Sequence, residues 1–245
     1  MITANSSLGL RSAELHQAYV LHSRNYRETS LIVDFLVLGV GRISAVVRGA
    51  RRAKSPQRSL LQPFDRLLIS WFGRGELKTL KVLEGDSQHS VLRGKALFSA
   101  LYLNELLVRL LKAEDACDTL FENYQQALCE LSQVQFVEPI LRRFEKQLLH
   151  ALGYGFSFPA IDPQIESAMQ CYYFDSDNQW LLMTAEPEQA LQARCFLARD
   201  IAAIAIDDYQ SSDSLRAAKR LMRLALAPLL GDKPLSSKSL FVKTT

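Results

Sequence analysis

The chain has 245 residues, of which 48% are hydrophobic and 22% are charged, and its formal net charge is +3. This balance is typical of a globular protein with one large domain or two smaller ones. No apolar run is long enough to cross a bilayer, and the Ser-rich start lacks the apolar core of a signal peptide, so we expect no membrane association and a cytoplasmic location.

The charge is unevenly distributed along the chain. Residues 1–85 carry 13 Lys and Arg against 6 Asp and Glu, residues 86–212 carry 9 against 18, and residues 213–245 carry 7 against 2. The two basic ends are therefore candidate surfaces for a polyanion, which the small total charge conceals.

Residues 15–85 are predicted to form a small β-barrel after a flexible tail of residues 1–14. Short apolar segments alternate with turn signals such as Gly39-Val40-Gly41 and Gly73-Arg74-Gly75. Five strands in this length suit the OB-fold, a barrel known for binding oligonucleotides, and an SH3-like barrel fits the pattern nearly as well. The predicted strands are Ala18–His22, Ser30–Leu38, Arg42–Arg48, Leu67–Phe72 and Leu77–Leu83.

Residues 86–245 are predicted to form a mainly helical domain, which makes the fold class α+β. The helical period fails at about 154–185, where Met169–Phe174 and Gln179–Met183 suggest a β hairpin inserted between helices. The last helix is expected to begin with Asp213 as its N-cap. The predicted helices are Ala96–Lys112, Asp118–Gln133, Glu138–Leu152, Glu188–Ile206 and Ser214–Leu230.

A basic run directly follows the third predicted strand and gives the strongest functional signal. Five cations in one loop beside a barrel suit the phosphates of DNA, and an ordinary solvated loop is the alternative. The aromatic residues that could stack on a base are Tyr19, Tyr26, Phe64, Trp71 and Phe72. Most of them are expected in the core, and only Tyr26, in a turn beside Arg24 and Arg27, is expected to be exposed. The candidate DNA-binding cations of this domain are Arg24, Arg27, Arg42, Arg48, Arg51, Arg52, Lys54, Arg58, Arg74 and Lys78.

A second basic surface is predicted on the helix Ser214–Leu230. Its cations Arg216, Lys219, Arg220 and Arg223 are spaced i, i+3, i+4 and i+7, which places them on one face. Four like charges on adjacent turns repel one another unless an anion lies nearby, so this face is also a candidate for DNA. A solvated face neutralised by acidic neighbours is the alternative.

The helix Glu138–Leu152 suggests a site for an acidic peptide. Arg142 and Lys146 project away from its core-facing stripe, and Leu149 is expected near them at the helix surface, with Leu152 beside it. An apolar spot rimmed by cations can capture an acidic, aromatic peptide. A plain amphipathic helix is the alternative.

The sequence shows no recognisable catalytic or metal-binding motif. The four cysteines, Cys117, Cys129, Cys171 and Cys195, form no CxxC and no cluster with histidines, and there is neither a P-loop nor a GxSxG elbow. A metal-dependent nuclease would need clustered carboxylates or histidines, which the basic domain lacks. We therefore expect a protein that is not an enzyme, with no metal or other cofactor and with reduced, buried thiols.

Several blocks spread over nearly the whole chain after Ser12 resemble one known family. They are AYVLHSRNYRETS at 18–30, GRISAVVRGAR at 41–51, LQPFDRLLI at 61–69, GRGELKTLK at 73–81, LYLNELLVRLL at 101–111, LRRFEKQLLHALGYG at 141–155 and LRAAKRLMRLALAPLLGDKPLSSKSLF at 215–241. Individually modest, they are jointly specific, because in this order and spacing they resemble the RecO family of bacterial recombinational repair.

The resemblance implies an N-terminal OB-fold, a helical C-terminal domain with a zinc-ribbon-like insertion, and a nucleoid-associated, DNA-binding recombination mediator. Such proteins bind single- and double-stranded DNA, anneal complementary strands, and act with RecR to replace single-strand-binding protein by RecA; whether RecF takes part is left open. A protein-interaction adaptor whose basic faces bind acidic proteins is the alternative, and would show little salt-dependent DNA binding.

Two site expectations follow from the same resemblance. The acidic C-terminal tail of single-strand-binding protein would be held by the helix that carries Arg142, Leu149 and Leu152. Some members place four zinc cysteines in the insertion, where this chain has only Cys171. We therefore expect no zinc and an insertion held together by packing alone.

Overall fold

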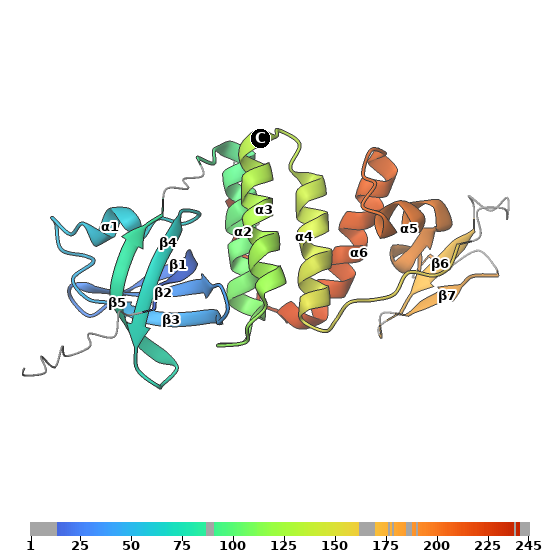
Figure 1. Cartoon of the computed structure of the whole chain (residues 1–245). Coiled ribbons are helices and arrows are strands. Elements are labelled where there is room, and N and C mark those ends of the chain that lie inside the picture. Colours follow the sequence, from blue (N-terminus) through green and yellow to red (C-terminus); the bar gives the residue numbers. More distant parts are fainter. Residues whose placement is uncertain are drawn as a thin grey trace, which may run out of the picture.

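The molecule is elongated, with a β-barrel at one end, a group of helices in the middle and a small sheet at the other end (Figure 1). The computed structural model describes residues 14–86, 91–161, 170–175, 177, 179–184, 188–189, 191–237 and 239–240. Nearly all of the predicted tail, residues 1–13, lies outside the described residues.

The predicted five-stranded barrel is confirmed. Its strands are β1 (His16–Tyr26), β2 (Ser30–Val37), β3 (Gly41–Val47), β4 (Arg66–Phe72) and β5 (Leu77–Gly85). They close in the order β1-β2-β3-β5-β4, with β1 paired to β4 and with β3 and β5 parallel. This closed five-strand arrangement is that of the OB-fold, so the strand order decides a question that the sequence pattern left open.

Strand β1 is longer than predicted. Its pairing with β2 continues past an irregularity between Val20 and His22 as far as Tyr26, opposite Ser30. Only three residues remain for the turn between the strands, in which Arg27 has a positive φ of 51°. Arg24 therefore lies on a strand, where the sequence suggested a turn.

The helical region contains three long helices that follow the barrel directly, namely α2 (Gly94–Leu110), α3 (Asp118–Gln133) and α4 (Glu138–Ala151). A single-turn helix, α1 (Gln57–Leu60), ends the basic loop of the barrel and was not predicted. The last helix, α6 (Ser212–Leu230), begins two residues earlier than expected, because the hydroxyl of Ser211 is its N-cap and accepts from the amide of Asp213. No described helix is both long and apolar enough to span a membrane.

The prediction of one helix over Glu188–Ile206 is wrong. The described part of this segment contains a 3-10 turn (Gln192–Arg194), the strand β8 (Cys195–Leu197) and the short helix α5 (Ala198–Ala205). Strand β8 pairs with β6 (Cys171–Phe174), which also pairs with β7 (Trp180–Leu182), so the insertion is a three-stranded sheet in the order β7-β6-β8. Cross-strand pairing from distant residues overrides the local helical pattern here.

An aromatic cluster forms the centre of the insertion. The ring centroids of Phe174 and Trp180 lie 4.8 Å apart, and those of Phe156 and Phe174 lie 5.2 Å apart. Phe196 of β8 completes the cluster, 5.6 Å from Trp180. Within the described residues no group of three His, Cys, Asp or Glu side chains gathers as metal ligands would. Ring packing of this kind is worth about 0.5–1.5 kcal/mol per pair beyond simple burial.

One hydrophobic core runs from the barrel into the helices. Tyr19, Leu21, Leu36 and Phe64 of the barrel belong to the same buried cluster as the apolar faces of the long helices. Inside this junction the amide of Asn104 on α2 donates to the carbonyl of Leu21 at 2.9 Å. The hydroxyl of Tyr124 donates to the Asn104 side-chain oxygen, so the buried amide is satisfied from both sides.

The opposite face of α2 holds the C-terminal segment. Arg109 donates to the carbonyls of Leu230 and Lys233, and the Glu105 carboxylate accepts from the amides of Ser236 and Ser237. Helix α2 therefore contacts both the barrel and the end of the chain.

The turn between β2 and β3 packs against the loop that joins α2 to α3. The amide of Glu114 donates to the carbonyl of Arg42 at 2.9 Å, and the amide of Gly39 donates to the Asp118 carboxylate at 2.8 Å. Gly41, with φ of 90°, lies so close to the loop that a Cβ atom would come within 2.6 Å of the carbonyl carbon of Asp115.

Replacing Gly41 by Ala is expected to destabilise the protein by roughly 3 kcal/mol, because the methyl group meets backbone that cannot move aside, and a positive φ adds strain. Gly39→Ala is the matched control, since Gly39 also has a positive φ, of 77°, but an added Cβ meets nothing within 4 Å. Urea unfolding of the two variants measures the difference, and equal losses would mean that the contact with Asp115 is relieved at no cost.

Candidate nucleic-acid interface

Seven predicted cations gather at one end of the barrel. The amide of Arg51 donates to the carbonyl of Thr29 at 2.9 Å, and its guanidinium donates to the carbonyl of Arg27 at 2.9 Å, so the basic loop lies against the β1–β2 turn. We call this surface the basic end, and all of its cations are exposed: Arg24, Arg27, Arg48, Arg51, Arg52, Lys54 and Arg58.

The loop of the basic end is anchored rather than extended into solvent. Ala50 is fully buried in the barrel core, and Gly49 takes a positive φ of 73° that lets the chain turn there. The amides of Arg52 and Ser55 donate back to carbonyls of Gly49 and Arg52. Charged side chains therefore surround a fixed backbone. None of the seven forms a salt bridge within the described part of the chain.

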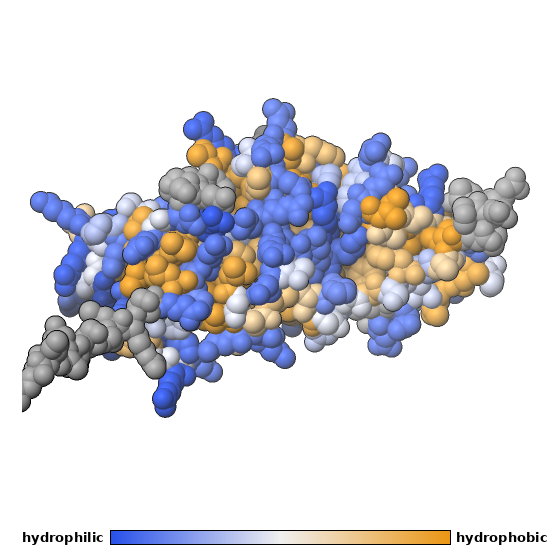
Figure 2. All heavy atoms as spheres, in the orientation of Figure 1, coloured by the Kyte–Doolittle hydropathy of each residue, from blue (hydrophilic) through white to orange (hydrophobic). Residues whose placement is uncertain are grey.

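The hairpin between β4 and β5 carries a further cation and an exposed aromatic ring. Arg74 is exposed at its tip, and Phe72, at the end of β4, is 55% exposed. The sequence pattern favoured a core position for Phe72, which is wrong, and its exposed ring is a stacking candidate in addition to Tyr26. In Figure 2 the barrel end shows projecting hydrophilic side chains around an apolar area.

Two cations predicted to bind DNA are used elsewhere. Lys78 is only 4% exposed and forms a salt bridge of 2.8 Å with Glu114 of the α2–α3 loop. Arg42 donates to the carbonyl of Leu111 at 3.0 Å and lies 3.7 Å from the Asp34 carboxylate. Both side chains fix the barrel to the helices, a role that is invisible until the α2–α3 loop is placed beside β3 and β5.

Of the four predicted DNA-binding cations on α6, two already have partners within the protein. Arg216 pairs with Asp213, and Arg220 donates to the carbonyl of Cys195 at 2.6 Å while its guanidinium lies 4.3 Å from the ring of Phe196. Lys219 and Arg223 are exposed. Two of the four cations therefore remain available for phosphate.

Helix α4 differs most from the expected surface. Leu149 was expected at the helix surface, but this is wrong, because its side chain is fully buried. Arg142 is 7% exposed and forms a salt bridge of 2.9 Å with Glu145. Burial raises the pKa of Glu145, and the charge of Arg142 opposes this effect.

Arg142 and Leu149 are buried because helix α4 packs against α3 on one side and against α6 on another. Lys146 donates to the carbonyls of Ile204 and Ala205 and pairs with Asp207 at 2.6 Å, and Leu152 is half-buried. The four residues do not form one exposed patch, and binding of an acidic tail here stays a prediction.

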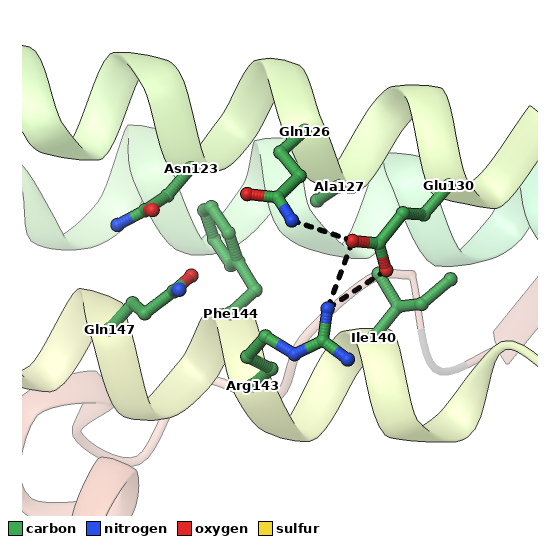
Figure 3. A pocket seen from close by; sticks show the side chains of 8 residues that line it. All are labelled: Asn123, Gln126, Ala127, Glu130, Ile140, Arg143, Phe144 and Gln147. Atoms are coloured by element: carbon green, nitrogen blue, oxygen red, sulfur yellow. Dashed lines mark hydrogen bonds and ion pairs between the residues drawn. The ribbon is translucent and has the colours of Figure 1, made fainter. Parts of the chain in front are cut away.

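A shallow hollow lies between α3 and α4 (Figure 3). Arg143 of α4 donates two hydrogen bonds across it to the Glu130 carboxylate of α3, at 2.9 and 3.0 Å. Gln126 donates to the same carboxylate at 2.8 Å. The side chains of Arg143, Glu130 and Gln126 thus satisfy one another.

Comparison with known proteins gives a consistent result over the two regions of the chain. Residues 13–87 match the family model "Recombination protein O N terminal", and residues 92–160 match "Recombination protein O C terminal". A DNA repair protein RecO of Cellvibrio japonicus is 43% identical over 232 residues, 93% of this chain and 96% of that protein.

Two further relatives bear the same name. The RecO of Pseudomonas aeruginosa is 45% identical over 94% of this chain and 95% of its own length, and that of Psychromonas ingrahamii is 42% identical over 94% and 98%. This chain belongs to the RecO family of DNA repair proteins.

Proposed function

We propose that this protein is a recombination mediator that binds single- and double-stranded DNA, anneals complementary strands and, with RecR, helps load RecA onto strands covered by single-strand-binding protein. It carries out no catalytic step of its own and acts at the nucleoid. The observation that supports DNA binding is the basic end, where seven exposed cations lie on an oligonucleotide-binding type of barrel and form no ion pair with any residue that the structure describes.

The cations of the basic end are suited to DNA because they have no carboxylate partner within the described residues. A cation that already has a carboxylate partner gains little from a phosphate, whereas a free cation releases a condensed counterion from DNA when it binds. The basic end would therefore track a phosphate backbone. Phe72 and Arg74, on the β4–β5 hairpin, offer an exposed ring and a charge to a single strand elsewhere on the barrel.

DNA binding and strand annealing by the purified protein, followed across a salt series, test the proposal. Affinity should fall steeply with salt, with a log–log slope of several units. A slope near zero would instead support an adaptor that binds acidic proteins.

Annealing of two strands requires a second DNA-binding surface besides the basic end. The exposed cations Lys219 and Arg223 on α6 would form this surface. Replacing both by Gln is expected to slow annealing roughly tenfold at ~0.1 M salt, as the loss of two phosphate contacts implies. Gln is preferred to a reversed charge, because the Arg223 charge also acts on the buried Glu145.

The matched control for this pair is Lys95→Gln with Lys112→Gln, two exposed cations with the same change in charge. Circular dichroism verifies that both double variants are folded. Equal annealing rates for the two would identify the α6 face as solvated and unused.

The acidic tail of single-strand-binding protein is proposed as a partner of the helical region on the strength of the family resemblance. In the described structure Arg142 is committed to Glu145 and Leu149 is buried. Direct contact of the tail with these two side chains would require an opening of the elements that pack against α4.

A further inference from the structure

The small sheet brings together two cysteines that the sequence placed apart. In the antiparallel pair β6–β8, Cys171 lies opposite Leu197 and Tyr173 lies opposite Cys195. Side chains that face one another across strands point to the same side, and this side repeats every second residue. Cys171 and Cys195 are therefore diagonal neighbours on one face of the sheet.

This face is the one opposite the aromatic cluster. Phe174, Trp180 and Phe196 alternate with the residues named above and lie on the other side of the sheet. Cys171 is half-buried, whereas Cys195 is 7% exposed and its thiol donates to the carbonyl of Leu191 at 3.3 Å. A small reagent thus meets Cys171 first.

The two thiols also interact directly. Burial raises the pKa of the Cys195 thiol, and the neighbouring Cys171, through its charge and a side-chain hydrogen bond, raises it further. Cys195 is thus held in its protonated form, and the more exposed Cys171 is the thiol that a small reagent reaches.

We propose that Cys171 and Cys195 form a redox-active pair, which a peroxide converts into an intramolecular disulfide that fastens β6 to β8. The thiolate of Cys171 attacks one oxygen of hydrogen peroxide and becomes a sulfenic acid, while the second oxygen leaves as hydroxide and takes up the proton released by the thiol. The sulfur of Cys195 then attacks the sulfenic sulfur, and a second water leaves. Two thiols and one peroxide give one disulfide and two waters.

Closure requires only a local shift. Diagonal neighbours on a sheet are about 7–8 Å apart, and a disulfide spans Cα atoms up to about 6.8 Å apart, so closure moves the backbones of the two strands about 1 Å closer without a change of fold. The bond would join β6 to a strand that is already tied to α6, because Arg220 holds the carbonyl of Cys195 and covers Phe196. The oxidised insertion is then linked covalently through β8 to the helical core.

The test uses the full-length reduced protein and hydrogen peroxide. After oxidation and blocking of remaining thiols, mass spectrometry of a non-reduced digest should show one peptide pair joined between Cys171 and Cys195, which disappears with dithiothreitol. The apparent melting temperature should rise by roughly 5 °C on oxidation and return on reduction.

Controls come from the same chain. Cys129 is exposed on α3, so Cys129→Ser should keep the cross-link and the thermal shift, whereas Cys171→Ser and Cys195→Ser should each lose both. Oxidation of Cys171 to sulfinic acid while Cys195 stays free, or disulfides formed between molecules through Cys129, would overturn the proposal. The wild-type digest decides this even if a variant folds poorly.

Discussion

Replacing Arg51, Arg52 and Lys54 by Ala is expected to lower the affinity for a single-stranded oligonucleotide about a hundredfold at ~0.1 M salt. Each of these exposed side chains belongs to the basic end and has no carboxylate partner within the described residues. Losing three phosphate contacts should also reduce the log–log salt slope by about two units, since a single-strand contact releases about 0.7 counterion. Fluorescence anisotropy at four or five salt concentrations measures both quantities.

The matched control removes three exposed cations outside the barrel, with Ala at Lys95, Lys112 and Lys233. Both variants lose the same charge, so a general effect of net charge would lower their affinities equally. Because Arg51 also donates to the carbonyl of Arg27, the melting temperature of the barrel variant is measured beside its affinity. An unchanged salt slope would place the dominant DNA surface elsewhere.

Replacing Arg142 by Ala is expected to destabilise the protein by about 3–5 kcal/mol, because it leaves the fully buried Glu145 carboxylate without its ion pair. Arg143→Ala on the same helix is the matched control. Its pair with Glu130 is about one-third exposed, and breaking it should cost less than about 1 kcal/mol. Urea unfolding monitored by circular dichroism distinguishes the two, and similar losses would mean that Glu145 finds other compensation.

The cost of Arg142→Ala should depend on pH in a defined direction. Burial already raises the pKa of Glu145, and loss of Arg142 raises it further. A carboxyl whose folded pKa lies above its unfolded value of about 4.3 is favoured in its neutral form by folding. The destabilisation should therefore be fully present well above the folded pKa and shrink as the pH falls towards about 4.3. Arg142→Ala combined with Glu145→Gln should lose this pH dependence.

The same charge pair affects any measurement of tail binding. The side chain of Arg142 was a natural probe while it was expected at the surface. Buried against Glu145, it cannot be removed without weakening the helical core. A reduced affinity of Arg142→Ala for an acidic peptide would have to be corrected for the unfolded fraction before it located a site.

The sequence predicted the barrel well, because the signals there are local. The strand β3 spans Gly41–Val47, close to the predicted Arg42–Arg48, and it alternates buried Ile43, Ala45 and Val47 with half-exposed neighbours. The basic loop after β3 was also found correctly, since a dense run of cations cannot be buried and must reach the surface. Its anchoring by Ala50 was not predictable, because it depends on the closed end of the barrel.

The errors arose where the partner of a side chain comes from a distant segment. From the sequence alone, Lys78 is a cation on a strand and was expected to be exposed. It is buried because Glu114 of the α2–α3 loop lies beside it and forms a salt bridge with it. The helical periodicity of α4 predicts which residues share a face of the helix. It does not predict that two other helices, α3 and α6, cover more than one of these faces. Cys195 was separated from the insertion because β8 looked like the middle of a helix, and that error also hid its neighbour Cys171.

The shared hydrophobic core at Tyr19, Leu21, Leu36 and Phe64 limits how the molecule can be divided for study. A fragment that ended at Gly85 would expose these side chains and leave the carbonyl of Leu21 without the amide of Asn104. Such a fragment would be prone to self-association, and a weak DNA signal from it would report an aggregate. A truncated protein should therefore retain α2, so that the barrel surface buried against this helix stays covered.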